Sequence, residues 1–312
     1  MVTESEQLRR RAGRRLLLAA LAALSWAAPL AAAPRVVASI TPLHSLAAAV
    51  MGDLGQPLQI VRGYGSPHAY QMRPSDAANL RDADLVLWIG PSLETFLQRP
   101  LAGRRDGTRV VTLLVVPGLA LLANRSGGVH NDDAHGQHEA GSYDPHIWLS
   151  PFNAKLIAGL IAKELGSLDP ENVEIYQTNA NRLSERIDIM ETRIASRLAP
   201  VVSVPFVVFH DAFQYFEKSF GLNTVGSVTV SPDHMPSARR IKTLRDEIAR
   251  SGARCVFREP QFESALVQVL LEGSDARAGV LDPLGTGMAP GPDAYFALMA
   301  ANTDALIECL DR

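Results

Sequence analysis

Three histidines are the residues of this sequence that could together bind a metal ion. They are His68, His146 and His210, in the segments SPHAY, YDPHIWLSP and VVFHDAF, each beside a polar turn and an apolar run. Imidazole is the commonest metal ligand near neutral pH, because its neutral form keeps a nitrogen lone pair available. Residues so far apart in the sequence cannot form a local zinc finger. A shared metal site therefore requires a fold that brings distant loops together, such as a cleft between two lobes.

Carboxylates near these segments are further candidates. Asp282, in GVLDPLGTG, follows a predicted strand and could complete a tetrahedral site or simply cap its own turn. Asp211 could orient the neighbouring His210 or its loop. Glu94 lies on a predicted helical stretch and is expected to be solvated. Each histidine taken singly also fits a solvated loop or a hydrogen-bonded core, so only the three together indicate a metal site.

A polar loop from about residue 124 to residue 143 carries additional potential ligands. Its histidines are His130, His135 and His138, among several acidic residues. Such a loop can collect metal weakly and raise its local concentration near a cleft, or it can be merely solvated. The remaining histidines, His44 and His234, are expected to be structural or on the surface.

Residues 1–33 have the order of regions typical of a secretory signal peptide. Several arginines precede an apolar run that begins at Leu16 and ends in small residues. The run is long enough to span a bilayer, so an uncleaved anchor is the alternative, although the alanine-rich end favours cleavage. The Arg14–Arg15 pair leaves twin-arginine export open beside the general route. No cysteine lies near the cleavage region, so we expect a soluble periplasmic protein without a lipid anchor.

Bulk composition indicates an ordinary globular protein. Roughly 280 residues follow the leader, enough for one large or two medium domains. Hydrophobic residues make up 47% and charged residues 20%, and the net charge of −3 gives no reason to expect nucleic-acid binding. Cys255 and Cys309 should cross-link in an oxidising compartment, which would stabilise the fold by roughly 4 kcal/mol. A pair of metal-binding thiolates is the alternative, although no histidine stands beside either cysteine.

Alternating apolar runs and helical patterns predict an α/β fold. The predicted strands are 35–40, 58–61, 84–89, 109–113, 206–209, 224–228, 255–258 and 278–281. The predicted helices are 75–81, 92–97, 150–165, 169–199, 212–220, 237–251, 264–272 and 293–310. The pattern predicts two similar α/β lobes, 34–168 and 200–312, each a mainly parallel sheet flanked by helices. One long helix, 169–199, should join them, with Asp169 as its N-cap and apolar residues every three or four positions.

Several motifs in order resemble a known receptor family. They are PHAYQMRPSD, ADLVLWIGPSLETFL, DPHIWLSP, FVVFHDAFQYFEKSFGL, EPQF and LDPLGT. Over about residues 35–309 the chain resembles the metal-binding receptors of ABC transporters (cluster A-I, or cluster 9), most closely the ZnuA type of periplasmic zinc receptor. The resemblance implies two lobes joined by a rigid helix, with metal held in the cleft between them.

The resemblance also assigns residues. It implies that His68 and His146 bind from the first lobe and His210 from the second. Asp282 matches a carboxylate that completes the site in some members, whereas in zinc receptors water or another carboxylate can take that corner. The pair Cys255 and Cys309 matches a disulfide of zinc members. The loop at 124–143 departs from the family pattern, because it has no long histidine run.

The implied function is uptake of Zn²⁺ as a transported ligand. Manganese-selective relatives replace the third histidine by glutamate, whereas this chain keeps His210, which suits zinc. The implied partners are an inner-membrane ABC permease and its ATPase subunit, and the receptor itself is expected to be a monomer. A manganese or iron receptor of the same class is the first alternative. A zinc hydrolase is the second, but the chain has no HExxH motif, so we do not expect an enzyme.

Overall fold

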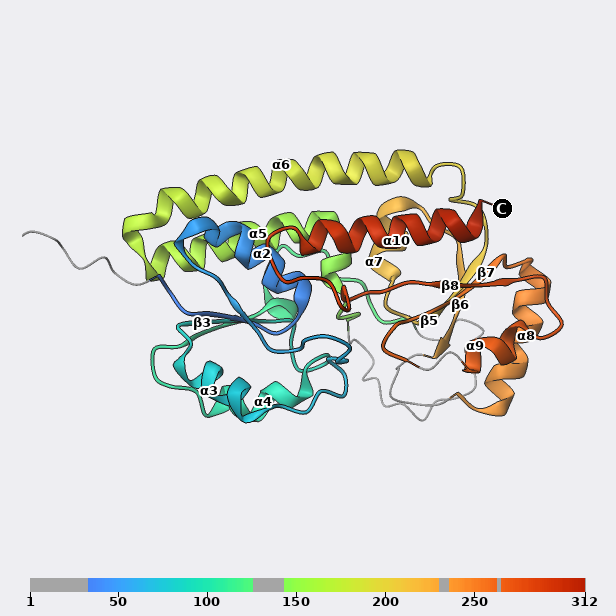
Figure 1. Ribbon diagram of the computed structural model, residues 1–312, viewed down its shortest axis with the longest axis horizontal. Helices are drawn as coiled ribbons and strands as arrows, with labels where there is room; N and C mark the ends of the chain where they lie inside the picture. The colour runs from blue at the N-terminus through green and yellow to red at the C-terminus, as the bar shows by residue number, and fades with distance from the viewer. Residues whose placement is uncertain (1–32, 126–142, 230–235, 263–264, 312) are drawn as a thin grey trace, which may run out of the picture. The chain divides into compact units, whose positions relative to one another are not determined.

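Two four-stranded sheets form the framework of the computed structural model, which describes residues 33–125, 143–229, 236–262 and 265–311 (Figure 1). The first sheet has the order β2-β1-β3-β4, with strands Leu58–Gln59, Val36–Ala38, Leu85–Trp88 and Arg109–Thr112. The second has the order β6-β5-β7-β8, with strands Thr224–Thr229, Phe206–His210, Cys255–Arg258 and Arg277–Val280. Every pairing between these strands is parallel. The predicted fold class is confirmed.

Helices cover both sides of the first sheet. α2 (Thr41–Met51) and α5 (Pro151–Leu168) lie on one side, and α3 (Pro74–Asp82) and α4 (Gln98–Ala102) lie on the other (Figure 1). The sequence reasoning missed α2, because its residues are buried on nearly all sides and show no polar face. The helix predicted at 92–97 is wrong in detail, since that stretch is a turn and a short 3₁₀ helix, Thr95–Leu97, that leads into α4.

Glu94 is fully buried, so the expectation that it is solvated is wrong. Its carboxylate accepts hydrogen bonds from Ser39 Oγ at 2.5 Å, Gly90 N at 2.9 Å and Ile89 N at 3.2 Å. Burial raises the pKa of Glu94 to about 7, and these donors act in the opposite direction. The side chain thus joins the ends of β1 and β3.

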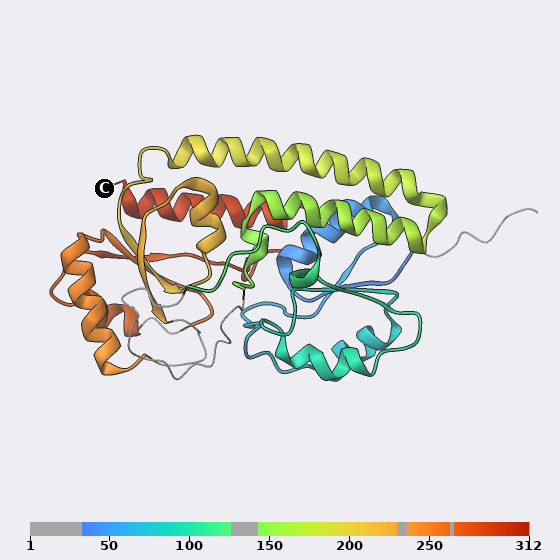
Figure 2. The same cartoon turned by 180° about the vertical axis from the view of Figure 1, so that it is seen from behind.

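The predicted joining helix begins with a 3₁₀ turn, Pro170–Asn172, and continues as α6 (Val173–Leu198). The predicted apolar stripe is buried at most of its positions, namely Tyr176, Ala180, Leu183, Ile187, Ile194 and Leu198. Asp169 accepts hydrogen bonds from Asn172 Nδ2 and Tyr176 Oη, both at 2.8 Å, so it ties the turn to the helix. α6 contacts α2 and α5 of the first lobe and extends alongside the second (Figure 2).

The second sheet has a core on each side. On β5, Phe206 and Val208 belong to the main hydrophobic cluster, whereas Val207 and Phe209 face a separate cluster. That separate cluster includes residues of α8 (Ala238–Ser251) and α9 (Ala265–Leu271), while α7 (Gln214–Phe220) contributes to the main one. The alternation follows from the two-residue period of a strand.

The last helix, α10 (Ala294–Leu310), begins against α2 of the first lobe and runs along the second lobe to the C-terminus (Figure 1), in contact with α6 and β8. Tyr295 N donates to Ser45 Oγ at 2.9 Å, and Arg186 of α6 pairs with Asp293 at 2.6 Å. α10 contacts both lobes, so it does not mark a boundary between them. The domain limits expected from the sequence stay a prediction. The predicted disulfide is confirmed, since Cys255 of β7 is bonded to Cys309 of α10. Among the described residues, no helix is both long and apolar enough to cross a membrane.

Candidate metal centre

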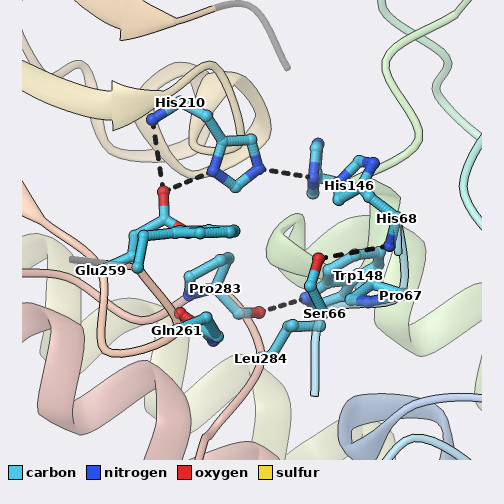
Figure 3. Close-up of a pocket in the computed structure, with 11 residues that line it drawn as sticks. Ser66, Pro67, His68, His146, Trp148, His210, Glu259, Gln261, Pro283 and Leu284 are labelled. Carbon is cyan, nitrogen blue, oxygen red and sulfur yellow. Dashed lines mark hydrogen bonds and ion pairs between the residues drawn. The ribbon is translucent and has the colours of Figure 1, made fainter. Parts of the chain in front are cut away.

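The three predicted histidines converge on one small cavity (Figure 3). His210 is the last residue of β5, His146 directly precedes a 3₁₀ helix (Ile147–Leu149), and His68 lies in the turn region between β2 and α3. One nitrogen from each ring lies within 4.8 Å of the other two. The ring centroids are 5.1 Å apart for His146 and His210, and 5.7 Å and 5.6 Å from His68 to these two rings. The sequence reasoning thus identified residues that the fold does bring together.

Two carboxylates define which ring nitrogens face the cavity. Asp144 Oδ1 lies 2.8 Å from His146 Nδ1, and Glu259 Oε1 forms a short hydrogen bond with His210 Nδ1. A carboxylate in its ionised form only accepts hydrogen bonds, so the Nδ1 atom that it contacts then carries the proton. Each carboxylate also accepts from the backbone N–H of its own histidine, at 2.9 Å and 3.3 Å. In the neutral rings, both Nε2 atoms therefore present lone pairs to the cavity.

These two lone pairs point at each other across a short distance. His146 Nε2 and His210 Nε2 are 3.2 Å apart, and the side chains of both residues are almost fully buried (Figure 3). Two neutral acceptors repel at this separation unless a proton or a metal cation lies between them. Tetrahedral zinc with bonds of 2.0–2.1 Å to nitrogen places its ligand atoms about 3.3 Å apart. The observed separation therefore fits two corners of a zinc site.

His68 supplies a third, unsatisfied nitrogen. Its Nε2 atom is buried and has no hydrogen-bond partner among the described residues. Burial, reinforced by the other two histidines, holds the pKa of His68 well below its ordinary value, and burial and His210 do the same for His146. Burial also disfavours the charged form of His210, but the carboxylates around it, Glu259 foremost and then Asp211 and Asp144, together raise the pKa of His210. Burial thus favours the neutral, metal-binding forms of His68 and His146, whereas a proton competes with the metal for His210.

A charged cluster behind the site connects the two lobes. Arg125 forms a short ion pair with Glu217 of α7, and it lies 3.3 Å from the carboxylate of Asp211. Asp211 therefore pairs with an arginine and is not bonded to His210. Gln214 of α7 donates to Asp144 at 3.2 Å, which fixes the carboxylate that holds His146. Burial raises the pKa of Asp144 to about 7, while its hydrogen-bond donors oppose the shift.

Of the predicted ligands that the structure describes, Asp282 alone lies outside the group of histidines. Both of its carboxylate oxygens accept hydrogen bonds within the second lobe, from Leu284 N at 2.9 Å, Thr286 N at 2.5 Å and Gln261 Nε2 at 3.0 Å. Asp282 therefore caps its own turn, which was the alternative expected from the sequence.

The remaining histidines lie elsewhere in the chain. His130, His135, His138 and His234 lie outside the described residues. His44 is buried, with Nε2 at 3.1 Å from the carbonyl oxygen of Pro57, as expected for a structural histidine. The partner role of Glu259 was missed, although its place directly after a buried strand was a usable signal. The DPH string around His146 was a second one, since a carboxylate two residues away reaches the ring easily.

Comparisons with known proteins agree with this geometry. The family described as "Zinc-uptake complex component A periplasmic" (ZnuA) matches residues 36–309. The chain is 42% identical to the high-affinity zinc uptake system protein ZnuA of Brucella suis, over 89% of this chain and 92% of that one. It is 36% identical to the protein of that name from Paracoccus denitrificans, over 95% of this chain and 97% of the relative.

Solved structures show the same fold. A crystal structure of a ZnuA has a TM-score of 0.73 and 27% identity, over 88% of this chain and 98% of the other. The laminin-binding protein Lmb of Streptococcus agalactiae, described as having adhesin and metal-transporting activity, has a TM-score of 0.74 and 27% identity, over 89% and 99%. With a family match over nearly all of the part after residue 35 and relatives well above 30% identity, the chain belongs to the ZnuA family of periplasmic zinc-uptake components.

Proposed function

We propose that this protein is a periplasmic receptor that binds Zn²⁺ through His68, His146 and His210 and delivers it to an ABC permease for zinc uptake. The observation that carries the proposal is the pair of Nε2 atoms of His146 and His210, 3.2 Å apart, with a carboxylate bonded to the Nδ1 atom of each ring. Burying two carboxylates costs free energy. A cation bound between the two rings offsets this cost, because the carboxylates orient both rings toward it.

Zinc is the ion that this donor set suits best among those the relatives are named for. Three neutral imidazoles form a borderline-soft site that matches zinc, whereas manganese prefers oxygen ligands. The relatives with the highest identity are named as zinc uptake proteins, which supports the same ion.

The remaining parts of the proposal concern the protein's surroundings. The receptor works as an exported monomer with a cleaved leader and no lipid anchor, together with an inner-membrane permease and its ATPase subunit. It binds and releases its ion without a chemical reaction, so it is not an enzyme. The family description as a periplasmic component supports the location. The histidines His130, His135 and His138 act as an auxiliary, weaker collector of metal.

Calorimetry on the mature, metal-stripped protein tests this function. Zinc should bind much more tightly than manganese, and His210→Ala should weaken zinc binding by more than about 100-fold, beyond the loss that outer-shell changes cause. His44→Gln is the matched control, because it removes a buried histidine that lies outside the group of three. Stronger binding of manganese, or indifference to the loss of His210, would refute the assignment. A second, weaker zinc equivalent would support the auxiliary loop.

A further inference from the structure

Gln261 stands between the metal cavity and the carboxylate of Asp282. The side chain of Gln261 lines the cavity together with the three histidines (Figure 3). Its Nε2 atom donates to Asp282 Oδ1 at 3.0 Å and to Thr286 Oγ1 at 2.5 Å. Asp282 itself does not line the cavity, although the next residue, Pro283, does. Asp282 is therefore one side chain away from the site.

The carboxylate dictates how the Gln261 amide is oriented. An ionised carboxylate accepts hydrogen bonds only, so the NH₂ group of Gln261 must face Asp282 and the amide oxygen must face away from it. That oxygen, Oε1, is buried and has no hydrogen-bond partner among the residues that the structure describes. The NH₂ group of Gln261 thus binds the Asp282 carboxylate, and its uncharged oxygen Oε1 remains as an acceptor on the opposite side.

The rest of the loop holds Asp282 in the same orientation. Leu284 N donates to Oδ1, Thr286 N donates to Oδ2, and Thr286 Oγ1 lies 3.2 Å from Oδ1. Asn302 of α10 fixes the backbone, because its side chain bonds to both the N–H and the carbonyl oxygen of Asp282. The carboxylate is thus satisfied without a metal ion.

We propose that Gln261 is a specificity-determining residue, which binds the Asp282 carboxylate and so keeps it out of the coordination sphere of the metal. The proposal deepens the zinc-receptor function and rests on it. With Asp282 held away, the group of ligand atoms that the described residues bring together consists of three imidazole nitrogens. A carboxylate at the fourth corner would add a hard, anionic oxygen, the ligand type that favours manganese. Gln261 therefore biases the site against manganese without touching the three histidines.

The test compares Zn²⁺ and Mn²⁺ binding by calorimetry in four proteins: wild type, Gln261→Ala, Asp282→Asn and the double variant. Gln261→Ala removes the donor and opens space toward the cavity, so manganese affinity should rise about tenfold, a change of the size that outer-shell partners produce. The double variant should lose this gain, because it removes the carboxylate charge. Asp282→Asn alone should leave zinc affinity nearly unchanged, since Asp282 is not a ligand in the wild type.

Visible absorption of bound Co²⁺ provides a readout that is independent of affinity. A fourth protein ligand in Gln261→Ala should change the cobalt spectrum, and the double variant should restore the spectrum of the wild type. An unchanged manganese affinity in a folded Gln261→Ala protein, or a gain that persists in the double variant, overturns the role of Gln261. Failure of the zinc-receptor function looks different, since wild-type protein would then bind zinc weakly or ignore the His210→Ala change.

Discussion

Replacing Glu259 by glutamine tests whether the orientation of His210 matters for zinc binding. In the structure the Glu259 carboxylate accepts from both Nδ1 and the backbone N–H of His210, and both side chains are almost completely buried. The carboxylate keeps the proton on Nδ1 and leaves Nε2 free for the metal. The amide of Glu259→Gln has nearly the same shape but no charge. It can also turn its NH₂ group toward Nδ1, which would move the ring proton to the metal-binding nitrogen.

The expected loss follows from one charged hydrogen bond. Outer-shell partners of a metal-bound histidine contribute about 10- to 100-fold to affinity, which corresponds to about 1.4–2.8 kcal/mol. A hydrogen bond to a charged group contributes about 1.5–3 kcal/mol in proteins, which is the same range. Because the contact is buried and therefore little screened by solvent, we expect the upper half of this range for Glu259→Gln.

Competition of the protein with a zinc chelator measures the loss, with Glu164→Gln as the control. Glu164 pairs with Arg109 at 3.0 Å near the surface, so its replacement should not change zinc affinity. NMR titration of the metal-free protein adds a second readout. Without the charge of Glu259, burial lowers the pKa of His210 and only the charges of Asp211 and Asp144 still oppose it, so this pKa should fall. A zinc affinity within about threefold of wild type, together with an unshifted His210 titration, would refute the reasoning, since outer-shell changes cost at least about 10-fold.

Three further outcomes are expected. Zinc affinity should fall about tenfold per pH unit once the pH drops below the raised pKa of His210, because a proton then competes with the metal. Calorimetry across pH 5–8 measures how steeply the affinity depends on pH, and a slope of about one corresponds to one competing proton. The double variant Cys255→Ser/Cys309→Ser should lose roughly 4 kcal/mol of unfolding free energy in denaturant titrations and keep its zinc affinity, because the disulfide does not touch the site. Arg125→Met should destabilise the protein by about 3 kcal/mol, since it leaves buried carboxylates without their partner. Arg109→Met, at a more exposed pair, should cost less than about 1 kcal/mol, and equal costs would contradict the role of Arg125.

The sequence was sufficient for the framework because the signals of this fold are local. Buried parallel strands are short continuous apolar runs, and each of the eight predicted runs overlaps an observed strand of the described residues. Such runs do not reveal a helix that is buried on every side, so α2 was missed. The contact of the start of α10 with the first lobe was also hidden, because a contact such as that of Tyr295 with Ser45 is set by tertiary packing.

The candidate ligands were predictable to different degrees. The three histidines stand out because imidazole at strand ends and turns is chemically conspicuous. Asp282 looked equally suitable, since a carboxylate after a strand can bind a metal or cap a turn. What separates the two outcomes is the presence of Gln261 and of two backbone N–H groups that satisfy the carboxylate locally. No pattern of residue types along the sequence reports such a competition.

The pairing of Glu259 with His210 shows what additional information would have been enough. β5 and β7 are parallel neighbours in register, with Phe206 opposite Cys255 and Val207 opposite Val256. Continuing that register along both strands places His210 opposite Glu259, at the edge where parallel strands end together. The sequence shows that both residues follow apolar runs, but the order β6-β5-β7-β8 is needed to make them neighbours. The step from a list of candidate residues to a site therefore depends on strand order, which is decided by the packing of the whole lobe.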